Sequence, residues 1–335
     1  MTTTPTPLRE HQIRPADHAA EQTRRYEADV ARLMARADEF VDVGCPACSG
    51  SDRRPRFTKY GLAYHTCTGC ETVYVSPRPT PALLKDYYEN SENYAFWNAV
   101  IFPASEAVRR ERIFRPRVER TIALAERHGV RRGTLVEVGA GFGTFCEELR
   151  ARDAFDRVVA IEPTPDLAAT CRARGVEVIE SRIEDAGLGE TADVVASFEV
   201  IEHLFEPAEF LVACRGMLRP GGLVVLTCPN IKGFDIDVLG AGSPAVDAEH
   251  LNYFHPASLG LLLERHGFEV LEAQTPGRLD ADIVRNRVLS GAHTLSDGFL
   301  RRVLVHEWDR VGENFQQFLV DQGLSSNLWI VARKR

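Results

Sequence analysis

Short apolar runs alternate with amphipathic segments through the middle and the end of the chain. The runs occur at 135–138, 158–161, 176–179, 193–198, 223–227, 268–273 and 328–333. Runs of this length, separated by segments of helical periodicity, are typical of strands buried on both faces of a parallel sheet. The pattern therefore predicts an α/β fold. Helices are expected at 21–41, 81–97, 104–128, 166–174, from 200 onward, and at 257–266.

Composition divides the chain further. The predicted units are 1–40, a helical arm; 41–80, a cysteine-rich ribbon; 81–130, a helical linker; 131–275, the α/β domain; 276–325, a helical insertion; and 326–335, the last strand of the sheet. Residues 1–20 are polar and contain prolines, so we expect them to be mobile. Residues 231–248 are rich in glycine and small side chains, which predicts a flexible loop.

The first apolar run ends in a turn that is rich in glycine. Residues 137–143 read E-V-G-A-G-F-G, and Thr144 follows as a candidate N-cap of a helix. A strand, a glycine turn and a helix N-terminus together direct backbone N–H groups toward a ligand. The spacing differs from the G-x-G-x-x-G of dinucleotide-binding turns, because Thr144 stands at the third glycine. Glu162 ends the second run, where a carboxylate can accept hydrogen bonds from two ribose hydroxyls.

From about Leu135 to Phe268, the order of these motifs resembles the class I S-adenosylmethionine (SAM)-dependent methyltransferases. The resemblance implies a Rossmann-like sheet whose last strand, 328–333, is antiparallel, with SAM as the cofactor. It places the methionine end of SAM at Glu137 and the glycine turn, and the ribose at Glu162. The SAM contacts that the resemblance implies are Glu137, Gly139, Ala140, Gly141, Gly143, Glu162, Pro163, Ile183, Glu184, Phe198 and Glu199.

Polar residues cluster after the fourth run, at Glu199, Glu202 and His203. Open α/β sheets bind ligands at the C-terminal ends of their strands, so we expect these residues near the reacting methyl group. His203 is a catalytic candidate. The alternative is a histidine that only forms a structural hydrogen bond to the backbone.

A second polar group follows the fifth run, at 247–255. His250 is the candidate base, with Glu249 as a partner beside it in sequence and Tyr253 as a further catalytic candidate. The alternative is that His250 positions the substrate or packs the start of the next helix. Tyr88 and Tyr94 belong to an aromatic cluster that is either core or a set of ring faces contacting the SAM sulfonium.

Four cysteines in the ribbon have the spacing C-x2-C-x18-C-x2-C: Cys45, Cys48, Cys67 and Cys70. This spacing predicts a zinc site in which each pair directs two sulfurs at one ion. A structural role is favoured, because the metal replaces a core in a segment too short to have one. Contact with nucleic acid and coverage of the substrate site are the alternatives. His65, two residues before the second pair, is expected to be exposed.

The net charge of −8 argues against broad nucleic-acid binding, which usually needs a basic face. No apolar run approaches the length of a membrane span, and the N-terminus lacks the apolar core of an export signal. These features predict a cytoplasmic protein that does not bind membranes. Reduced thiols are expected in that compartment.

The ribbon, the aromatic linker and the motif E-H-x-x-Y-F resemble bacterial methyltransferases that modify sugar nucleotides and secondary metabolites. Deoxysugar C-methyltransferases carry Tyr-x-Glu-His, whereas this chain has Asp247 at the tyrosine position. O-, N- or C-methylation of a small molecule is therefore expected. The alternatives are an RNA methyltransferase docking through the ribbon and a non-catalytic SAM-binding protein. Residues 280–320 are expected to cover the substrate pocket or to form a homodimer interface.

Overall fold

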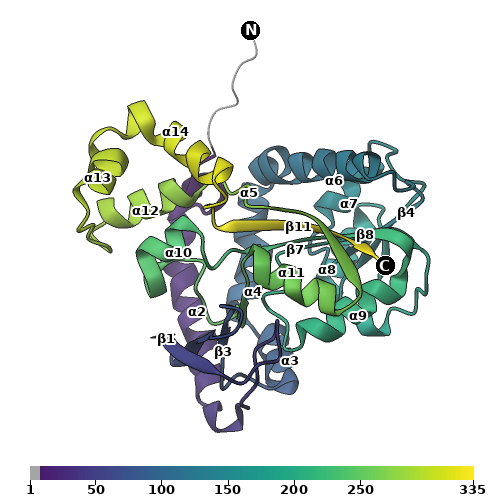
Figure 1. The fold of residues 1–335 in the computed structure, drawn as a ribbon, viewed down its shortest axis with the longest axis horizontal. Helices are drawn as coiled ribbons and strands as arrows, with labels where there is room; N and C mark the ends of the chain where they lie inside the picture. The colour runs from purple at the N-terminus through teal and green to yellow at the C-terminus, as the bar shows by residue number, and fades with distance from the viewer. Residues whose placement is uncertain (1–7) are drawn as a thin grey trace.

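The computed structural model describes residues 8–335 and centres on a seven-stranded sheet (Figure 1). In spatial order its strands are β10 (Phe268–Gln274), β11 (Asn327–Lys334), β8 (Leu218–Pro229), β7 (Ala192–Phe198), β4 (Thr134–Val138), β5 (Arg157–Ile161) and β6 (Glu177–Ile179). All neighbouring pairs are parallel except those that involve β11, which runs antiparallel to β8 and β10. The predicted α/β fold with an antiparallel last strand is confirmed.

Successive residues of the central strands point to opposite faces of the sheet, and each face has its own core. Leu135 packs with Phe145 and Leu149 on one face, whereas Val136 packs with Phe210 on the other. The first face is covered by α6 (Arg115–Arg127), α7 (Thr144–Arg150) and α8 (Pro165–Ala173), and the second by α9 (Pro207–Met217) and α11 (Pro256–Arg265). Burial on both faces explains why these strands appear as continuous apolar runs in the sequence.

A second, antiparallel sheet contains the ribbon. Its strands, in order, are β1 (Arg53–Lys59), β2 (Leu62–Cys67), β3 (Val73–Val75) and β9 (Asn252–Tyr253). The last of these comes from a segment far along the chain, between β8 and α11, and pairs Tyr253 with Val73. The ribbon at 41–80 is therefore completed by residues of the predicted α/β domain.

Helices of the N-terminal third flank the ribbon in sequence and lead to the main sheet. They are α1 (Glu10–Ile13), α2 (Ala19–Met34), α3 (Pro81–Glu89), α4 (Glu92–Phe96) and α5 (Phe102–Arg109). From α4 to α6 the helical path continues through two π-helical turns, η3 (Trp97–Ile101) and η4 (Arg110–Phe114). Residues 1–20 are the segment expected to be mobile. Its first seven residues lie outside the described residues, whereas Glu10–Ile13 is helical. The helix expected at 21–41 ends earlier, at Met34.

Residues after β10 form a helical lobe, which Figure 1 shows in yellow and yellow-green at the upper left. It consists of α12 (Asp280–Leu289), α13 (Gly298–Arg301), η7 (Arg302–His306) and α14 (Trp308–Asp321). The lobe has its own apolar core, in which Val284, Leu304 and Trp308 pack with Leu239 of α10 (Phe234–Leu239). The predicted helical insertion is confirmed. Its placement over a substrate pocket stays a prediction.

Two expectations about local structure are wrong. Residues 200–203 form a turn, and the next helix begins only at Pro207, whose fixed φ suits the first helical turn. The segment 231–248 is not a flexible loop, since it contains α10 and the buried residues Val246 and Ala248. Its glycine at 233 is required by close packing, because an added Cβ would lie 2.2 Å from the Cα of Ser326. Within residues 8–335, no helix is both long and apolar enough to cross a membrane.

Candidate active site

The glycine turn lies between β4 and α7, as the sequence predicts. Gly139, Gly141 and Gly143 have φ values of +74°, +55° and +70°, which residues with side chains rarely adopt. A Cβ added at Gly141 would meet no atom within 4 Å, so the backbone borders open space at this point. The expected capping role of Thr144 is wrong, because Gly143 occupies the N-cap position and the Thr144 hydroxyl has no partner among the described residues.

Glu162 stands at the C-terminal end of β5 and faces the glycine turn. Its two oxygens accept hydrogen bonds from the backbone N–H groups of Gly141 and Thr164, at 2.8 and 2.9 Å. Burial raises the pKa of this carboxyl, although both backbone donors act against the shift. Each oxygen retains a lone pair, so the carboxylate fits a ligand with two vicinal hydroxyls.

Glu137 lies on β4 and is buried. The thiol of Cys146 in α7 donates a hydrogen bond to its carboxylate, at 3.0 Å. Burial raises the pKa of Glu137 to about 8, against the opposing effects of Cys146 and of the guanidinium of Arg117. A cationic group bound beside this carboxylate would stabilise its ionised form.

The glycine turn is covered by the helical linker. The ring of Phe142, inside the turn, is stacked on Phe102 of α5 with their centroids 3.6 Å apart and their planes 5° from parallel. The segment 81–130 thus contacts the turn directly. Its role as a lid over SAM stays a prediction.

The remaining implied SAM contacts differ in accessibility. Ile183 is buried in the short helix η5 (Ile183–Asp185), whereas Pro163 and Glu184 are exposed and Glu184 pairs with Arg182 at 3.2 Å. Phe198 is buried against Phe145 and under the guanidinium of Arg117. These positions are consistent with an adenine site, and the contacts themselves stay predictions.

Glu199 follows β7 with a positive φ of +58°. Its Oε1 atom accepts hydrogen bonds from Thr227 at 2.6 Å and Asn327 at 3.1 Å, and lies 3.5 Å from Arg117. The side chain is thus held by three elements. Arg117 was not among the predicted site residues, and no pattern in the sequence distinguishes it from the other arginines of its helix.

Glu202, His203 and His250 meet next to the end of β7. The two imidazole rings are 4.6 Å apart between centroids, and the hydroxyl of Tyr88 lies 3.2 Å from Nδ1 of His203. Glu202 is fully buried, which raises the pKa of its carboxyl well above the ordinary value. Burial, together with the neighbouring His250, lowers the pKa of His203. The structure therefore unites both candidate histidines with Glu202, which the sequence placed near the reacting methyl group without a catalytic role.

The partner of His250 differs from the predicted one. Nδ1 of His250 lies 2.9 Å from the carbonyl oxygen of Ala245 and 3.4 Å from the carboxylate of Asp247. Glu249 instead accepts hydrogen bonds from the hydroxyls of Tyr87 and Tyr94, both at 3.0 Å. The expected pairing of Glu249 with His250 is therefore wrong, since the Glu249 carboxylate is engaged by the aromatic linker. Burial raises the pKa of Glu249 to about 7.

Tyr253 and the linker tyrosines are oriented by these contacts. The hydroxyl of Tyr253 donates to the carbonyl of Ala245 and accepts from the N–H of Asp247, at 3.2 Å each. Tyr253 is fully buried, so its side chain supports the loop that carries His250. Tyr88 and Tyr94 direct their hydroxyls at His203 and Glu249. Only their ring faces remain for the predicted contact with SAM.

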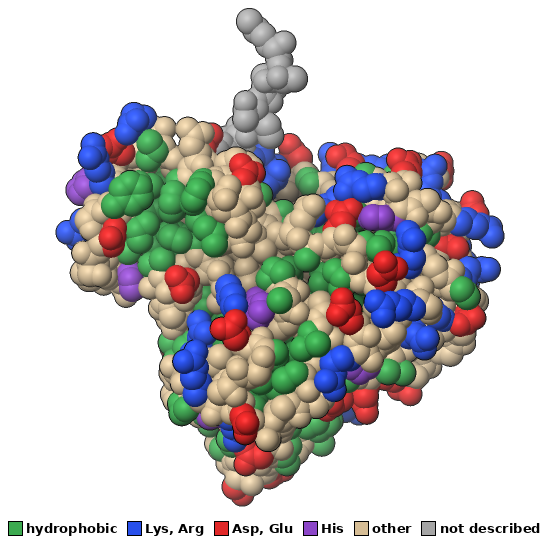
Figure 2. Space-filling model, viewed as in Figure 1, with side chains coloured by type: hydrophobic (Ala, Val, Ile, Leu, Met, Phe, Trp, Pro, Cys, Tyr) green, Lys and Arg blue, Asp and Glu red, His purple; other side chains and the backbone are tan. Residues whose placement is uncertain are grey.

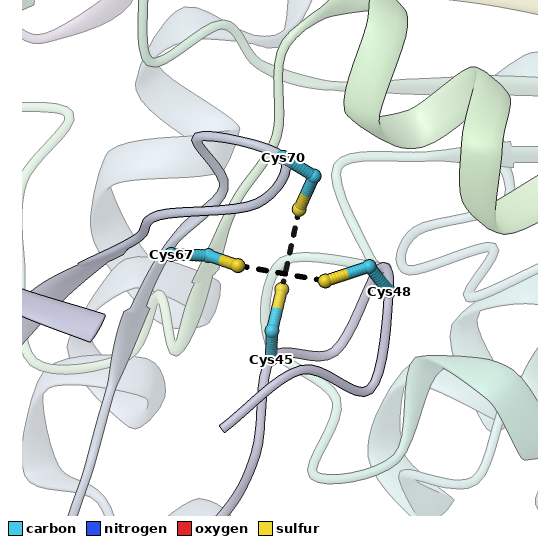
Figure 3. Close-up of side chains that lie close together, drawn as sticks. All are labelled: Cys45, Cys48, Cys67 and Cys70. Atoms are coloured by element: carbon cyan, nitrogen blue, oxygen red, sulfur yellow. Dashed lines mark hydrogen bonds between the residues drawn. The ribbon is translucent and has the colours of Figure 1, made fainter. Parts of the chain in front are cut away.

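The four cysteines converge on one point (Figure 3). Their Sγ atoms all lie within 4.8 Å of one another, and those of Cys45 and Cys70 and of Cys48 and Cys67 are 3.4 Å apart. A tetrahedral zinc ion with Zn–S bonds of about 2.3 Å needs sulfurs roughly 3.8 Å apart, so the group fits the ion after small shifts. His65 is not exposed as expected, because its Nε2 atom is bonded to the carbonyl of Ser76 at 2.8 Å.

Comparison with known proteins agrees with this geometry. Residues 108–273 match the family described as a methyltransferase domain. A protein of Mycolicibacterium smegmatis named as a probable S-adenosylmethionine-dependent methyltransferase is 35% identical over 144 residues, covering 41% of this chain and 52% of the relative. A ubiquinone biosynthesis O-methyltransferase of Cereibacter sphaeroides is 34% identical over 116 residues, covering 32% and 46%. The chain thus spans about half the length of these curated relatives.

Solved structures include more distant neighbours. A SAM-dependent methyltransferase from Thermotoga maritima has 17% identity and a TM-score of 0.46, covering 72% of this chain and 99% of that one. Another from Mesorhizobium loti has 16% identity and a TM-score of 0.40, covering 60% and 90%. The family match rests on sequence, and the strand order, the glycine turn and the acid after β5 agree with it. Residues 108–273 therefore carry the match to a methyltransferase domain, and β11, outside that range, completes its sheet.

Proposed function

We propose that this protein transfers the methyl group of SAM to a small-molecule acceptor. The observation that carries the proposal is the open space at Gly141, whose bare backbone is bonded to the buried carboxylate of Glu162, with the buried Glu137 on the strand that leads into the turn. Glu162 would hold the ribose hydroxyls and Glu137 the ammonium of the methionine end. Bound SAM would supply a methyl group on an electrophilic sulfonium.

The acceptor would approach from the side of His203 and His250. Because Nδ1 of His250 donates to the Ala245 carbonyl, its Nε2 atom carries the lone pair that a base needs. An acceptor hydroxyl placed there would lose its proton to Nε2 while its oxygen bonds to the methyl carbon and the carbon–sulfur bond breaks. Alignment of acceptor and methyl group would supply much of the rate.

A small acceptor is favoured over a nucleic acid. The net charge of −8 opposes binding to a polyanion, and the curated relatives include an O-methyltransferase of ubiquinone biosynthesis. Sugar nucleotides and secondary metabolites remain our proposed acceptor class, with transfer to oxygen, nitrogen or carbon. The cysteine cluster would hold a structural zinc ion, because four thiolates fill its coordination sphere.

Calorimetric titration with S-adenosylhomocysteine, the product of SAM, tests the donor site. The protein should bind it at one site, and Gly141→Arg should abolish binding, because the side chain would enter the open space beside the turn. Gly291→Arg is the matched control, since Gly291 also has a positive φ of +75° and open surroundings, but lies in the helical lobe. Absence of binding by the unaltered protein would refute the proposal.

A further inference from the structure

Glu202 is the least satisfied polar side chain near the acceptor side. It is 0% exposed, and neither of its carboxylate oxygens has a hydrogen-bond partner within the described part of the chain. Burying a carboxylate or a carboxylic acid without partners costs several kcal/mol. A side chain in this state indicates a missing ligand, because neither protonation nor the surrounding protein satisfies both oxygens.

The atoms nearest to this acid form a ligand set. Glu202, His203 and His250 each offer one ligand atom, and the three atoms lie within 4.8 Å of one another. The two histidines come from different segments, one from the turn after β7 and the other from the loop before β9. The fold therefore brings together one carboxylate and two imidazoles at the place where the acceptor is expected.

In both histidines the hydrogen bonds involve Nδ1, which leaves Nε2 of each ring available to bind an ion. Nδ1–H of His250 donates to the carbonyl of Ala245, and Asp247 stands 3.4 Å behind the same nitrogen. Nδ1 of His203 lies 3.2 Å from the hydroxyl of Tyr88, and this hydroxyl can accept a hydrogen bond from Nδ1–H. Metal-binding histidines usually donate their second N–H to a carbonyl, carboxylate or similar acceptor, which fixes the ring and the tautomer.

We propose that Glu202, His203 and His250 bind a divalent transition-metal ion, separate from the four-cysteine site. One carboxylate and two imidazoles suit Mn²⁺, Fe²⁺, Co²⁺ or Zn²⁺ better than Mg²⁺ or Ca²⁺, which favour oxygen ligands alone. Three protein ligands leave coordination positions open, and an oxygen of the acceptor would fill one of them.

This inference rests on the proposed function and narrows it. A bound ion would favour acceptors that present a hydroxyl or another oxygen for coordination, and it would polarise that oxygen before methyl transfer. It also changes the role of His250, because an imidazole that binds the ion through Nε2 cannot accept a proton on the same atom. With the ion bound, the metal rather than His250 would activate the coordinated hydroxyl, and its proton would pass to water as the oxygen bonds to the methyl carbon and the carbon–sulfur bond breaks.

The test is a titration of the full chain with Mn²⁺, followed by electron paramagnetic resonance of the free ion. The zinc in the cysteine site is left in place, since thiolates prefer zinc to manganese. We expect one Mn²⁺ bound per chain. Glu202→Gln and His250→Asn should each weaken binding at least tenfold, because each removes one ligand with little change of volume.

His306→Asn is the matched control, because His306 is exposed in the helical lobe and should leave Mn²⁺ binding unchanged. Thermal unfolding and binding of S-adenosylhomocysteine, measured on the same samples, show whether each variant is folded and its donor site intact. The inference is overturned if the unaltered protein binds no Mn²⁺, or if Glu202→Gln binds it as tightly as the unaltered protein. If the unaltered protein does not bind S-adenosylhomocysteine, the proposed function is refuted instead.

Discussion

Glu137 and Glu162 are both buried beside the glycine turn, but their carboxylates have different partners. Glu162 receives two backbone N–H donors, whereas the side-chain donor to Glu137 within residues 8–335 is the weakly polar thiol of Cys146. Burial raises the pKa of both. In the free protein the Glu162 carboxylate is thus oriented to accept hydrogen bonds from a ligand. The ionised form of Glu137, in contrast, is stabilised when a cation binds beside it.

Binding of the product at the donor site should release protons at neutral pH. Glu137 has a pKa of about 8 in the free protein, so it is mostly protonated at pH 7. The ammonium of the bound ligand favours the ionised carboxylate, and a proton is therefore lost on binding. Calorimetric enthalpies of S-adenosylhomocysteine binding should differ between phosphate and Tris buffers. Glu137→Gln should remove the difference, and an unchanged buffer dependence would contradict the assigned role.

The same shift predicts how stability depends on pH. A carboxyl whose pKa rises from 4.5 to about 8 on folding keeps its proton longer in the folded state than in the unfolded state. Stability contributed by the neutral Glu137 is therefore complete below pH 4.5 and is lost as the pH rises toward 8. Glu137→Gln should flatten the decline in free energy of unfolding between pH 5 and 8, measured with urea. Glu184→Gln, at an exposed position, is the control.

Sequence reasoning located the glycine turn and the acid after β5 because both features are local. The positive φ values of three glycines and the acid after β5 depend on a short stretch of backbone. Contacts between residues far apart in the sequence could not be predicted in this way. Arg117 reaches Glu199 from another helix, and Glu249 is engaged by Tyr87 and Tyr94 rather than by its neighbour His250. Such pairings depend on the packing of distant elements, which spacing does not record.

At the scale of elements, the segment 243–254 joins several parts of the molecule. It carries His250, continues into β9 of the ribbon sheet, and contacts the linker through Glu249. Glycine and small residues predicted a flexible loop at 231–248, which overlaps this segment, yet the segment is buried and held by side-chain hydrogen bonds. The strands were predictable because burial on both faces leaves a continuous apolar run. The ordered conformation of this segment was not predictable, because it depends on contacts with residues from elsewhere in the chain.

Tyr253→Phe tests whether this segment is held in place. The change removes a buried hydroxyl that bridges the carbonyl of Ala245 and the N–H of Asp247. The N–H of Asp247 is then left unpaired, whereas the carbonyl of Ala245 keeps its bond from His250, and the free energy of unfolding should fall by about 1–3 kcal/mol. Faster amide exchange should be confined to residues 245–250, while S-adenosylhomocysteine affinity stays the same. Phe57→Leu, a change at a half-buried ring of β1, should not produce this local pattern.

On the scale of the whole molecule, the methyltransferase domain carries two additions of different kinds. The helical lobe has its own apolar core, and Figure 2 shows hydrophobic side chains gathered on one face of it. A surface hollow of about 360 Å³ is lined there by Phe299, Val303, Val311 and Phe315 among others. The ribbon instead shares a sheet with the segment that holds His250. The two additions should therefore affect function differently.

If the four cysteines hold a zinc ion, as proposed, its removal should disturb the acceptor side and spare the donor side. Without an ion, four closely spaced sulfurs lose the bonds that hold the two knuckles together, and β3 loses its support. Because β3 pairs with β9, the disorder should extend to the loop of His250. The glycine turn and Glu162 follow β4 and β5 of the seven-stranded sheet and have their own partners.

Cys45→Ser should therefore leave S-adenosylhomocysteine affinity within about twofold, yet raise amide exchange at 245–254 and lower the unfolding temperature. Cys214→Ala is the control, since Cys214 is a buried free cysteine that does not belong to the group of four converging thiols. Its zinc content should be unchanged, whereas Cys45→Ser should retain little zinc. If Cys45→Ser lost zinc without any change of exchange at 245–254, the ribbon would be an independent appendage rather than a support for the acceptor loop.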